Sequence, residues 1–378
     1  SHYYVSGGFL DQSGIVKSVN YRRFTFQSNS DAQVLKWLKF SNNITFSADT
    51  KKSGSYSIGD ALKALPIYPV KNEDGSWSGP EGNSEWYGST RNPIGPTELN
   101  QGQTNGYNFL ANLTAELAFT KWLKFKSTFG YDAKFWFIDN FTPKYDWKPT
   151  PTEETSRYKS DNKSFTYLWD NYFLFDHTFA EKHYVKAMLG FNQELTKYNT
   201  TTATRQNLIS QDLPSMSLGT GMQTVSESGY EWALRGGFFR LNYIYNNRYL
   251  FEVNGRYDGT SRFPSDNRFV FLPSFSGAWR VSEEAFMEST RSWLDNLKVR
   301  ASYGILGNQL LTASSWSGNT KYYPYIPFMA SGTAGNWLFV DGEKSLYINP
   351  AGLVSSDLTW EKASTFNIGL DFTMLNQR

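Results

Sequence analysis

The sequence alternates between apolar and polar residues over long segments, and this pattern strongly limits how the chain can fold. In residues 123–137, apolar side chains occupy nearly every second position, and the residues between them are mostly charged, small or polar. Residues 38–48, 249–258 and 366–372 repeat the pattern. Because successive side chains of a strand point to opposite faces, the pattern predicts strands with one apolar face and one polar face.

The composition excludes a helical membrane protein. Aromatic residues make up 17% of the chain and charged residues 19%, below the ~25% charge of an average soluble domain. Mean hydropathy is nevertheless −0.52, and no run approaches the ~20 apolar residues that cross a bilayer as a helix. Polar residues must therefore lie close to the aromatic ones, as they do along alternating strands.

About twelve strands are predicted, many of them long enough to cross a bilayer, which takes ~9–11 residues for a tilted strand. They cover residues 2–10, 15–28, 37–49, 105–119, 122–138, 165–179, 184–200, 231–245, 248–258, 268–281, 297–306 and 362–373.

The connections between these strands differ in length in a regular way. The long ones, at 50–104, 139–164, 201–230 and 307–361, all occupy odd-numbered places in the chain order. The even-numbered ones are mostly tight turns, although residues 282–294 predict a short helix with Ser282 as its N-cap. Long loops at one end and short turns at the other are typical of outer-membrane barrels. The sequence thus predicts an all-β, antiparallel, up-and-down transmembrane β-barrel with extracellular long loops.

Tryptophans near the short turns suggest a membrane-interface belt. The five-residue motif Lys-Trp-Leu-Lys-Phe occurs twice, around Trp37 and Trp122, at the beginning of two strands and at the same end of the sheet. Trp293 is assigned to the same belt. An indole at headgroup level beside a lysine suits that position. Simple capping of the strands is the alternative interpretation.

Several function classes lack the residues that they need. The net charge of +2 gives no basic patch for nucleic acid, there is no cysteine, and His2, His177 and His183 are the only histidines. No catalytic or nucleotide-binding motif is present, so we expect neither an enzyme nor a metal or other cofactor. Oxygen-rich clusters at 72–75 and 258–267 resemble calcium ligands but are more often turns.

Two sets of residues are candidates for contact with a substrate. Charges on the polar faces line a wet interior or contact a plug: Lys124, Lys126, Asp132, Glu252, Arg256, Lys298 and Arg300. Aromatic residues in the long loops stack on sugar rings or extended peptides, or else hold the loops together: Trp77, Trp86, Tyr87, Trp316, Tyr322, Tyr323, Tyr325 and Trp337.

Five segments in order along the chain resemble the barrel of the SusC/RagA family of TonB-linked outer-membrane transporters of the Bacteroidota. They include Tyr-Val-Ser-Gly-Gly-Phe-Leu-Asp at the start of 4–16 and Gly-Arg-Tyr-Asp-Gly-Thr-Ser-Arg-Phe at the end of 247–263. The others are Phe-Leu-Pro-Ser-Phe-Ser-Gly-Ala-Trp-Arg at 271–280, residues 297–309, and 358–363 with 366–372. The long loops resemble nothing in particular.

The resemblance implies a 22-stranded barrel around an N-terminal plug, capped outside by a SusD-like surface lipoprotein. It also implies energy from the TonB–ExbB–ExbD system acting through the plug, contact with outer-membrane lipid, a glycan or peptide substrate, and two such pairs forming a dimer. Plug, TonB box, signal peptide and terminal strands are missing from residues 1–378. We therefore expect an interior piece of a longer protein, whose other strands lie elsewhere.

The function expected on these grounds is import of nutrient oligomers across the bacterial outer membrane by the barrel subunit of a SusCD-like complex. A second hypothesis is a TonB-dependent siderophore or cobalamin receptor without a lipoprotein lid. A third, from another class, is a soluble carbohydrate-binding β-protein.

Overall fold

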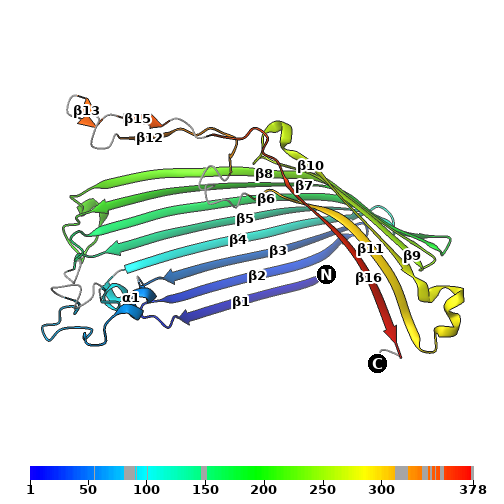
Figure 1. Cartoon of the computed structure of the whole chain (residues 1–378), viewed down its shortest axis with the longest axis horizontal. Helices are drawn as coiled ribbons and strands as arrows, with labels where there is room; N and C mark the ends of the chain where they lie inside the picture. The colour runs from blue at the N-terminus through cyan, green and yellow to red at the C-terminus, as the bar shows by residue number, and fades with distance from the viewer. Residues whose placement is uncertain are drawn as a thin grey trace.

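Twelve antiparallel strands form one continuous sheet in the computed structural model, and each strand pairs with its neighbour in the chain. The structure describes residues 1–54, 56–80, 90, 92–99, 101–145, 151–310, 322–333, 339–340, 343–344, 346–349 and 353–375. The sheet is strongly twisted and curved (Figure 1). Its strands are β1 His2–Ser13, β2 Asn20–Leu35, β3 Leu38–Lys52, β4 Gln101–Ala118, β5 Leu123–Thr142, β6 Ser156–Phe179, β7 His183–Gln206, β8 Gln223–Tyr245, β9 Tyr249–Thr260, β10 Phe269–Arg280, β11 Leu294–Asn308 and β16 Glu361–Met374.

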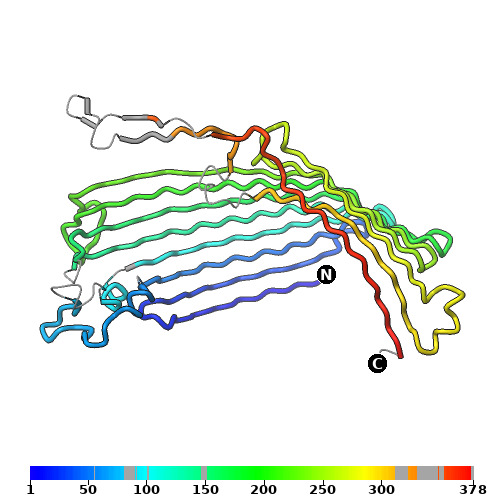
Figure 2. The backbone as a smooth tube through the Cα atoms, in the orientation of Figure 1, coloured from blue at the N-terminus to red at the C-terminus, as the bar shows by residue number. Residues whose placement is uncertain are grey.

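This arrangement confirms the predicted all-β meander and its twelve strands. β1 and β16 are the two ends of the strand order, so the sheet is an unclosed part of a barrel. Figure 2 shows the first and the last strand as two separate edges of the curved sheet. Open edges carry unpaired backbone groups, which proteins do not leave in lipid.

Short elements occupy the connections. The 53–100 connection contains the short helix α1 Ile58–Lys63, whose N-cap Ser57 accepts a hydrogen bond from the backbone N–H of Asp60. No described helix is long and apolar enough to pass through a lipid bilayer. The remaining elements are α3 Gly95–Leu99, η1 Met216–Leu218, η2 Ser265–Asn267, η3 Val281–Glu283, η4 Ala285–Thr290, β12 Ala330–Thr333 paired with β15 Leu346–Asn349, and β13 Phe339–Val340 paired with β14 Glu343–Lys344.

The strands run further toward the long connections than the alternation predicts. The segments predicted as loops at 139–164 and 201–230 shrink to 143–155 and 207–222, because β5 to β8 extend into them. The first turn also lies later, since β1 continues to Ser13 and β2 begins only at Asn20. In these extensions both faces of the strands are polar, so the apolar alternation that marks a strand is lost while the backbone pairing continues.

The predicted asymmetry of the connections is present. The tight turns at 180–182 and 246–248 contain consecutive residues with positive φ: Ala180 and Glu181 in the first, Asn246 and Asn247 in the second. Such paired left-handed residues match the twist of hairpin strands. The connections at 53–100, 143–155, 207–222 and 309–360 meet at the other end of the sheet.

The predicted helix at 282–294 is wrong in type. This segment forms two 3₁₀ turns, η3 and η4, and Ser282 does not cap a helix but lies buried within η3. The carboxylate of Glu284 organises the segment, because Tyr249, Trp279 and Arg248 all donate hydrogen bonds to it. The connection therefore docks on the ends of β9 and β10 through side chains, which the helical pattern could not indicate.

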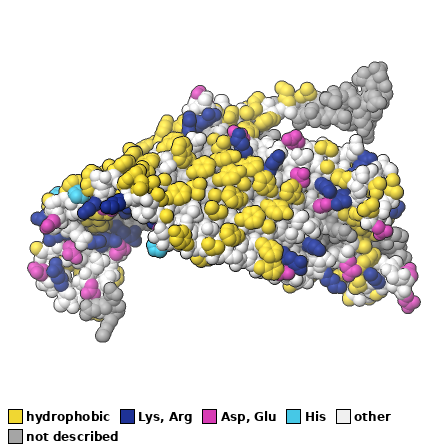
Figure 3. Space-filling model, turned by 180° about the vertical axis from the view of Figure 1, so that it is seen from behind, with side chains coloured by type: hydrophobic (Ala, Val, Ile, Leu, Met, Phe, Trp, Pro, Cys, Tyr) yellow, Lys and Arg dark blue, Asp and Glu magenta, His cyan; other side chains and the backbone are white. Residues whose placement is uncertain are grey.

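The register gives the sheet two faces of opposite character. Partners such as Phe125 and Phe173, or Val299 and Leu370, bring apolar residues together on what we call the apolar face. The opposite, polar face carries Lys126, Arg300 and the other charges predicted to share it. A broad band of hydrophobic side chains crosses the apolar face (Figure 3).

The hydrophobic core of this single-layer sheet is small. Phe263, Val270 and Trp360 form the buried cluster, against which Leu234, Leu272 and Leu358 pack. Large apolar side chains on the apolar face stay exposed, including Phe251 at 53% and Phe366 at 68%. A soluble protein rarely exposes so continuous an apolar surface, so lipid is the environment that fits it.

Candidate functional site

The apolar face changes character where the strands approach the long connections. Along β6 the apolar positions of this face end at Phe165. The next residues on the same face, toward the long connection, are Lys163, Asp161, Lys159 and Arg157. On the neighbouring strands, Asp139 pairs with Arg157 at 2.7 Å, and Lys197 pairs with Glu231 at 2.9 Å. Charges at lipid-facing parity mark the height at which the sheet leaves an apolar environment.

The length of the apolar band matches a bilayer. On β5 it extends from Leu123 to Phe137, about 48 Å along the strand at ~3.4 Å per residue. A strand tilt of ~40° reduces this to about 36 Å in height, enough for the ~25 Å apolar band of outer-membrane barrels with its aromatic borders. β6, with 24 residues, is longer still. Its far end therefore projects beyond the band.

Aromatic side chains gather on the polar face at this far end. Trp136 of β5 stacks on Tyr198 of β7 with ring centroids 5.7 Å apart, and Tyr198 lies 4.8 Å from Tyr230 of β8. Tyr322 of the last long connection stacks on Tyr230 at 3.7 Å with an interplanar angle of 8°. These four rings form a continuous aromatic ladder across the polar face, from β5 to the 309–360 connection.

Arg262 supports one end of the aromatic ladder. Its guanidinium carbon lies 5.0 Å from the ring centre of Trp232 and 4.9 Å from that of Tyr322. The side chain is 4% exposed, and burial lowers the pKa of the guanidinium. Among the described residues, its Nε and Nη1 atoms have no hydrogen-bond partner. Cation–π contacts with the two rings are thus the main interactions that the structure shows for this charge.

Two further tyrosines attach the 309–360 connection to the barrel wall. The hydroxyl of Tyr323 accepts a hydrogen bond from the backbone N–H of Glu231 and donates one to its carbonyl. The hydroxyl of Tyr325 donates to the carbonyl of Ser261 at 3.4 Å. Of the predicted loop aromatics, Tyr322 therefore belongs to the aromatic ladder, and Tyr323 and Tyr325 attach the same connection to the neighbouring wall.

The other predicted loop aromatics do not join them in the described structure. Trp77 lies in the 53–100 connection, where the Lys71 ammonium sits 4.4 Å above its ring and the two residues form a β-bridge. This placement favours the interpretation that Trp77 holds its own loop together. Trp86, Tyr87, Trp316 and Trp337 lie outside the described residues.

Asn162 organises the polar face beneath the aromatic ladder. It is 6% exposed, accepts a hydrogen bond from the hydroxyl of Tyr198, and donates to the carbonyl of Trp136 and to the hydroxyl of Ser160. Thr166 and Thr196 are joined by a hydrogen bond of 2.9 Å between their hydroxyls. These contacts hold the rings and hydroxyls in place before any ligand arrives.

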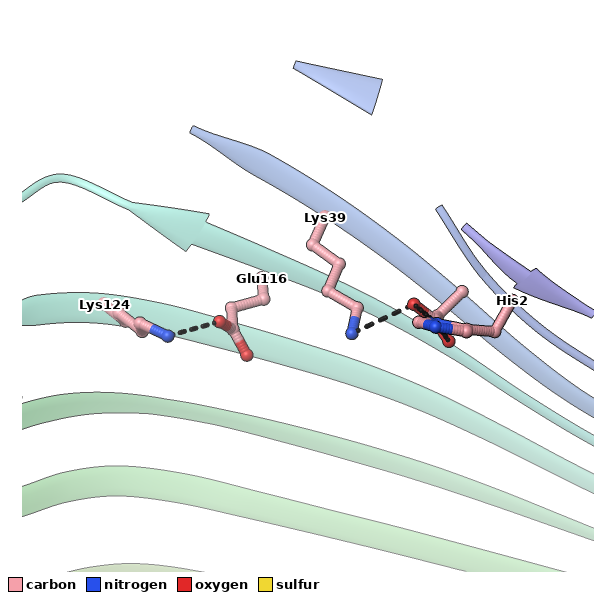
Figure 4. A network of polar contacts seen from close by, with 5 residues as sticks. His2, Lys39, Glu116 and Lys124 are labelled. Atoms are coloured by element: carbon pink, nitrogen blue, oxygen red, sulfur yellow. Dashed lines mark hydrogen bonds and ion pairs between the residues drawn. The ribbon is translucent and has the colours of Figure 1, made fainter. Parts of the chain in front are cut away.

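Most of the predicted polar-face charges have partners, and all but Arg256, which lies toward the 261–268 connection, and Asp132, near the middle of β5, lie nearer the short turns. Lys124 contacts Glu116 at 2.9 Å (Figure 4), Asp132 contacts Lys134, and Arg256 forms a bidentate pair with Asp258. Lys126 lies opposite Glu116 in the register. The polar face thus carries compensated charges there.

Three of the predicted charges come together. Lys298 and Arg300 both contact Asp371 of β16, at 2.8 and 3.2 Å. With Glu252, which accepts a hydrogen bond from Asn254, they line a cavity of about 350 Å³. Ser276 and Ser302 add hydroxyls to its lining.

The predicted belt tryptophans are exposed at the end with the short turns. Trp37, Trp122 and Trp293 are 50%, 40% and 48% exposed. The ring of Trp122 packs edge-on against Phe175, a residue of the apolar face, with centroids 5.4 Å apart. Their role as an interfacial belt stays a prediction.

The oxygen-rich clusters form turns or ion pairs. Residues 72–76 make a tight turn with Gly75 at φ +84°, and Asp74 accepts hydrogen bonds from Ser76. Within the described residues, no group of three or more potential metal ligands is found.

The sequence interpretation missed most of the aromatic ladder. Trp136, Tyr198, Tyr230, Trp232 and Arg262 are not among the residues that the sequence predicts to contact a substrate. Large aromatic residues at polar-face positions were the available signal. Their neighbours across the sheet depend on register, which the alternation does not supply.

These features define part of the wall of a transmembrane β-barrel, and comparison with known proteins agrees. Residues 17–377 match the family model described as "TonB dependent receptor-like, beta-barrel". The chain belongs to this family.

Individual relatives point to the Bacteroidota branch. The chain is 30% identical to "TonB-dependent receptor P26" of Formosa agariphila and 27% identical to "TonB-dependent receptor SusC" of Bacteroides thetaiotaomicron. Each alignment covers all of this chain but only 37% and 38% of the relative. The fold matches the "Structure of the RagAB peptide transporter" with a TM-score of 0.82 at 23% identity, over all of this chain and 41% of that one. The chain thus spans well under half the length of the proteins that it matches.

Proposed function

We propose that this chain is part of the barrel subunit of a SusCD-like complex, which imports nutrient oligomers across the bacterial outer membrane in a TonB-dependent manner. The observation that carries the proposal is the pairing of an exposed apolar band on one face with a polar, partly aromatic face on the other. Family membership supports it. The relatives named above are called receptors or transporters, which supports transport rather than catalysis.

In this proposal the polar face lines the lumen. An oligomer enters from the end with the long connections and first meets the aromatic ladder. Further down, the charges around Lys298 and Arg300 lie where a plug is held in the whole protein. Closure of the barrel by further strands satisfies the exposed edges of β1 and β16.

The partners follow from the same proposal. A SusD-like surface lipoprotein closes the end with the long connections, the TonB–ExbB–ExbD system drives release through the plug, and two such complexes associate as a dimer. The extracellular assignment of the long connections fits the charges that follow the apolar band at that end.

Uptake by intact cells tests the proposal. We expect deletion of the TonB box from the full-length protein, or a protonophore, to reduce uptake of the transported oligomer at least tenfold, while surface binding persists. The substrates are labelled oligomers prepared from the polymers on which the bacterium grows. Uptake is also measured in a strain that lacks the partner lipoprotein. Uptake that survives both treatments contradicts TonB dependence. Uptake of a ferric siderophore or cobalamin that is independent of any lipoprotein favours the lidless receptor instead.

A further inference from the structure

Charge is segregated between the two faces of β6, β7 and β8 at the end with the long connections. At apolar-face parity these strand ends carry eight charged residues: Arg157, Lys159, Asp161, Lys163, Lys197, Arg205, Glu227 and Glu231. The alternate residues of the same strand ends, which lie on the polar face, include no charged residue. We call this second set the neutral wall; it consists of Ser156, Tyr158, Ser160, Asn162, Ser164, Thr166, Thr196, Tyr198, Thr200, Thr202, Thr204, Gln206, Thr224, Ser226, Ser228, Tyr230 and Trp232.

Water contact alone does not explain the neutral wall. The charged residues of these strand ends show that the same stretch of chain accommodates lysine, arginine and acidic side chains where they face outward. The wall has hydroxyl, amide and aromatic groups instead. Hydroxyls both donate and accept hydrogen bonds, and aromatic faces contribute apolar contact area without charge.

The wall is also preorganised. Asn162 fixes the ring of Tyr198 by a hydrogen bond of 3.0 Å, and Tyr198 in turn packs between Trp136 and Tyr230. Thr202 and Ser226 are opposite each other in the register, beside this row of rings. A ligand that lies along the wall therefore meets rings and hydroxyls together, whose positions do not have to be ordered on binding.

Arg262 does not change the character of the wall. Its guanidinium is 4% exposed and lies against the rings of Trp232 and Tyr322. It therefore acts as a positioning residue for these rings. Its charge is covered rather than presented to a passing ligand.

We infer that the neutral wall, with Trp136 at its edge, binds an uncharged oligosaccharide, with sugar rings stacked on the aromatic ladder and sugar hydroxyls bonded to the wall. This inference rests on the proposed import function and names its substrate class. An oligouronide or sulfated glycan brings a charge to every residue, and a peptide brings two charged termini. The wall itself offers no complementary charge to either, and Lys134, which lies opposite Ser164 at its lower border, is already paired with Asp132 at 2.9 Å.

Calorimetric binding to the full-length protein in complex with its lipoprotein tests the inference. The probes are a panel of neutral hexasaccharides of different linkage, an oligouronide of equal length and a peptide of six uncharged residues. We expect a neutral hexasaccharide to bind most tightly. Tighter binding of the oligouronide or the peptide overturns the inference, as does failure of every neutral probe. TonB-dependent uptake of the peptide would leave the import function standing while removing the neutral-glycan assignment.

Matched variants locate the site. We expect Trp136→Ala to weaken neutral oligosaccharide binding about tenfold, which corresponds to about 1.4 kcal/mol, and Trp136→Phe to retain affinity within about threefold because a ring remains. Trp169→Ala, on the adjacent strand but on the apolar face with 52% exposure, is expected to leave affinity unchanged. Equal affinities for Trp136→Ala and Trp169→Ala would place the glycan elsewhere.

Adjacent threonines give a second comparison. Thr202 faces the neutral wall and Thr201 faces outward. We expect Thr202→Val to weaken binding a few-fold through loss of one hydroxyl, and Thr201→Val to have no effect. The reverse order of effects contradicts the assigned face.

Discussion

Phe263→Ala is expected to destabilise the folded barrel by about 3–5 kcal/mol, the usual cost of removing a buried phenylalanine. Phe263 is 1% exposed and packs edge-on against Trp360, with ring centroids 5.8 Å apart. Trp360 is itself fixed by a hydrogen bond from its indole N–H to the carbonyl of Arg268. The pair joins the 261–268 turn to the segment that precedes β16, so a cavity there loosens two connections at once.

Guanidinium unfolding of the full-length protein in lipid vesicles measures this effect. Phe286→Ala provides the control, because Phe286 is 66% exposed at the opposite end of β10 and should cost less than about 1 kcal/mol. A loss below 1 kcal/mol for Phe263→Ala as well would show that the cluster does not contribute to barrel stability.

Phe129→Arg is expected to cost about 2–4 kcal/mol, the penalty for an arginine near the bilayer midplane on the lipid face of a barrel. Phe129 lies halfway along the apolar band of β5, is 44% exposed, and has Leu113 and Trp169 as register partners. Thr128→Arg is the matched control, since the adjacent Thr128 points to the polar face, where its hydroxyl contacts that of Thr114.

The comparison uses the same unfolding measurement, together with the fraction of protein that inserts into the outer membrane. We expect Thr128→Arg to insert and to lose much less stability than Phe129→Arg, because its guanidinium reaches water. Equal losses for both variants would mean that the apolar face does not contact lipid. A larger loss for Thr128→Arg would reverse the assignment of the two faces.

The sequence was sufficient to predict the strands of the barrel wall, but not their ends near the long connections. Alternation at positions such as Phe125 and Lys126 depends only on the two-residue period of a strand, and every one of the twelve strands was located. Prediction of strands from the alternation failed where both faces are polar, as around Lys159 and Ser160, because no contrast in hydropathy remains there. The 3₁₀ turns at 281–290 were also missed, since the contacts of Glu284 with Arg248 and Tyr249 bring together residues distant in the chain.

The candidate site was predicted only in part for a related reason. Tyr322, Tyr323 and Tyr325 were chosen as loop aromatics, and the structure brings them to the polar face. Their partner Tyr230 is a strand residue, and the alternation records its face but not its neighbours. The stacking of Tyr322 on Tyr230 at 3.7 Å depends on where the long connection returns to the sheet, which the alternation does not contain.

The sequence by itself determined which residues share a face, the order of the strands and the family. The first two depend on local periodicity, and the family is recognised from short segments that resemble its barrel. The tertiary structure alone decided that Trp136, Tyr198, Tyr230 and Tyr322 form one row, that Arg262 is buried behind it, and that the uncharged positions at the ends of β6, β7 and β8 are paired into one wall. Each of these needs the register of several strands at once. Register follows from backbone pairing along whole strands and from the return of the long connections, neither of which a local pattern contains.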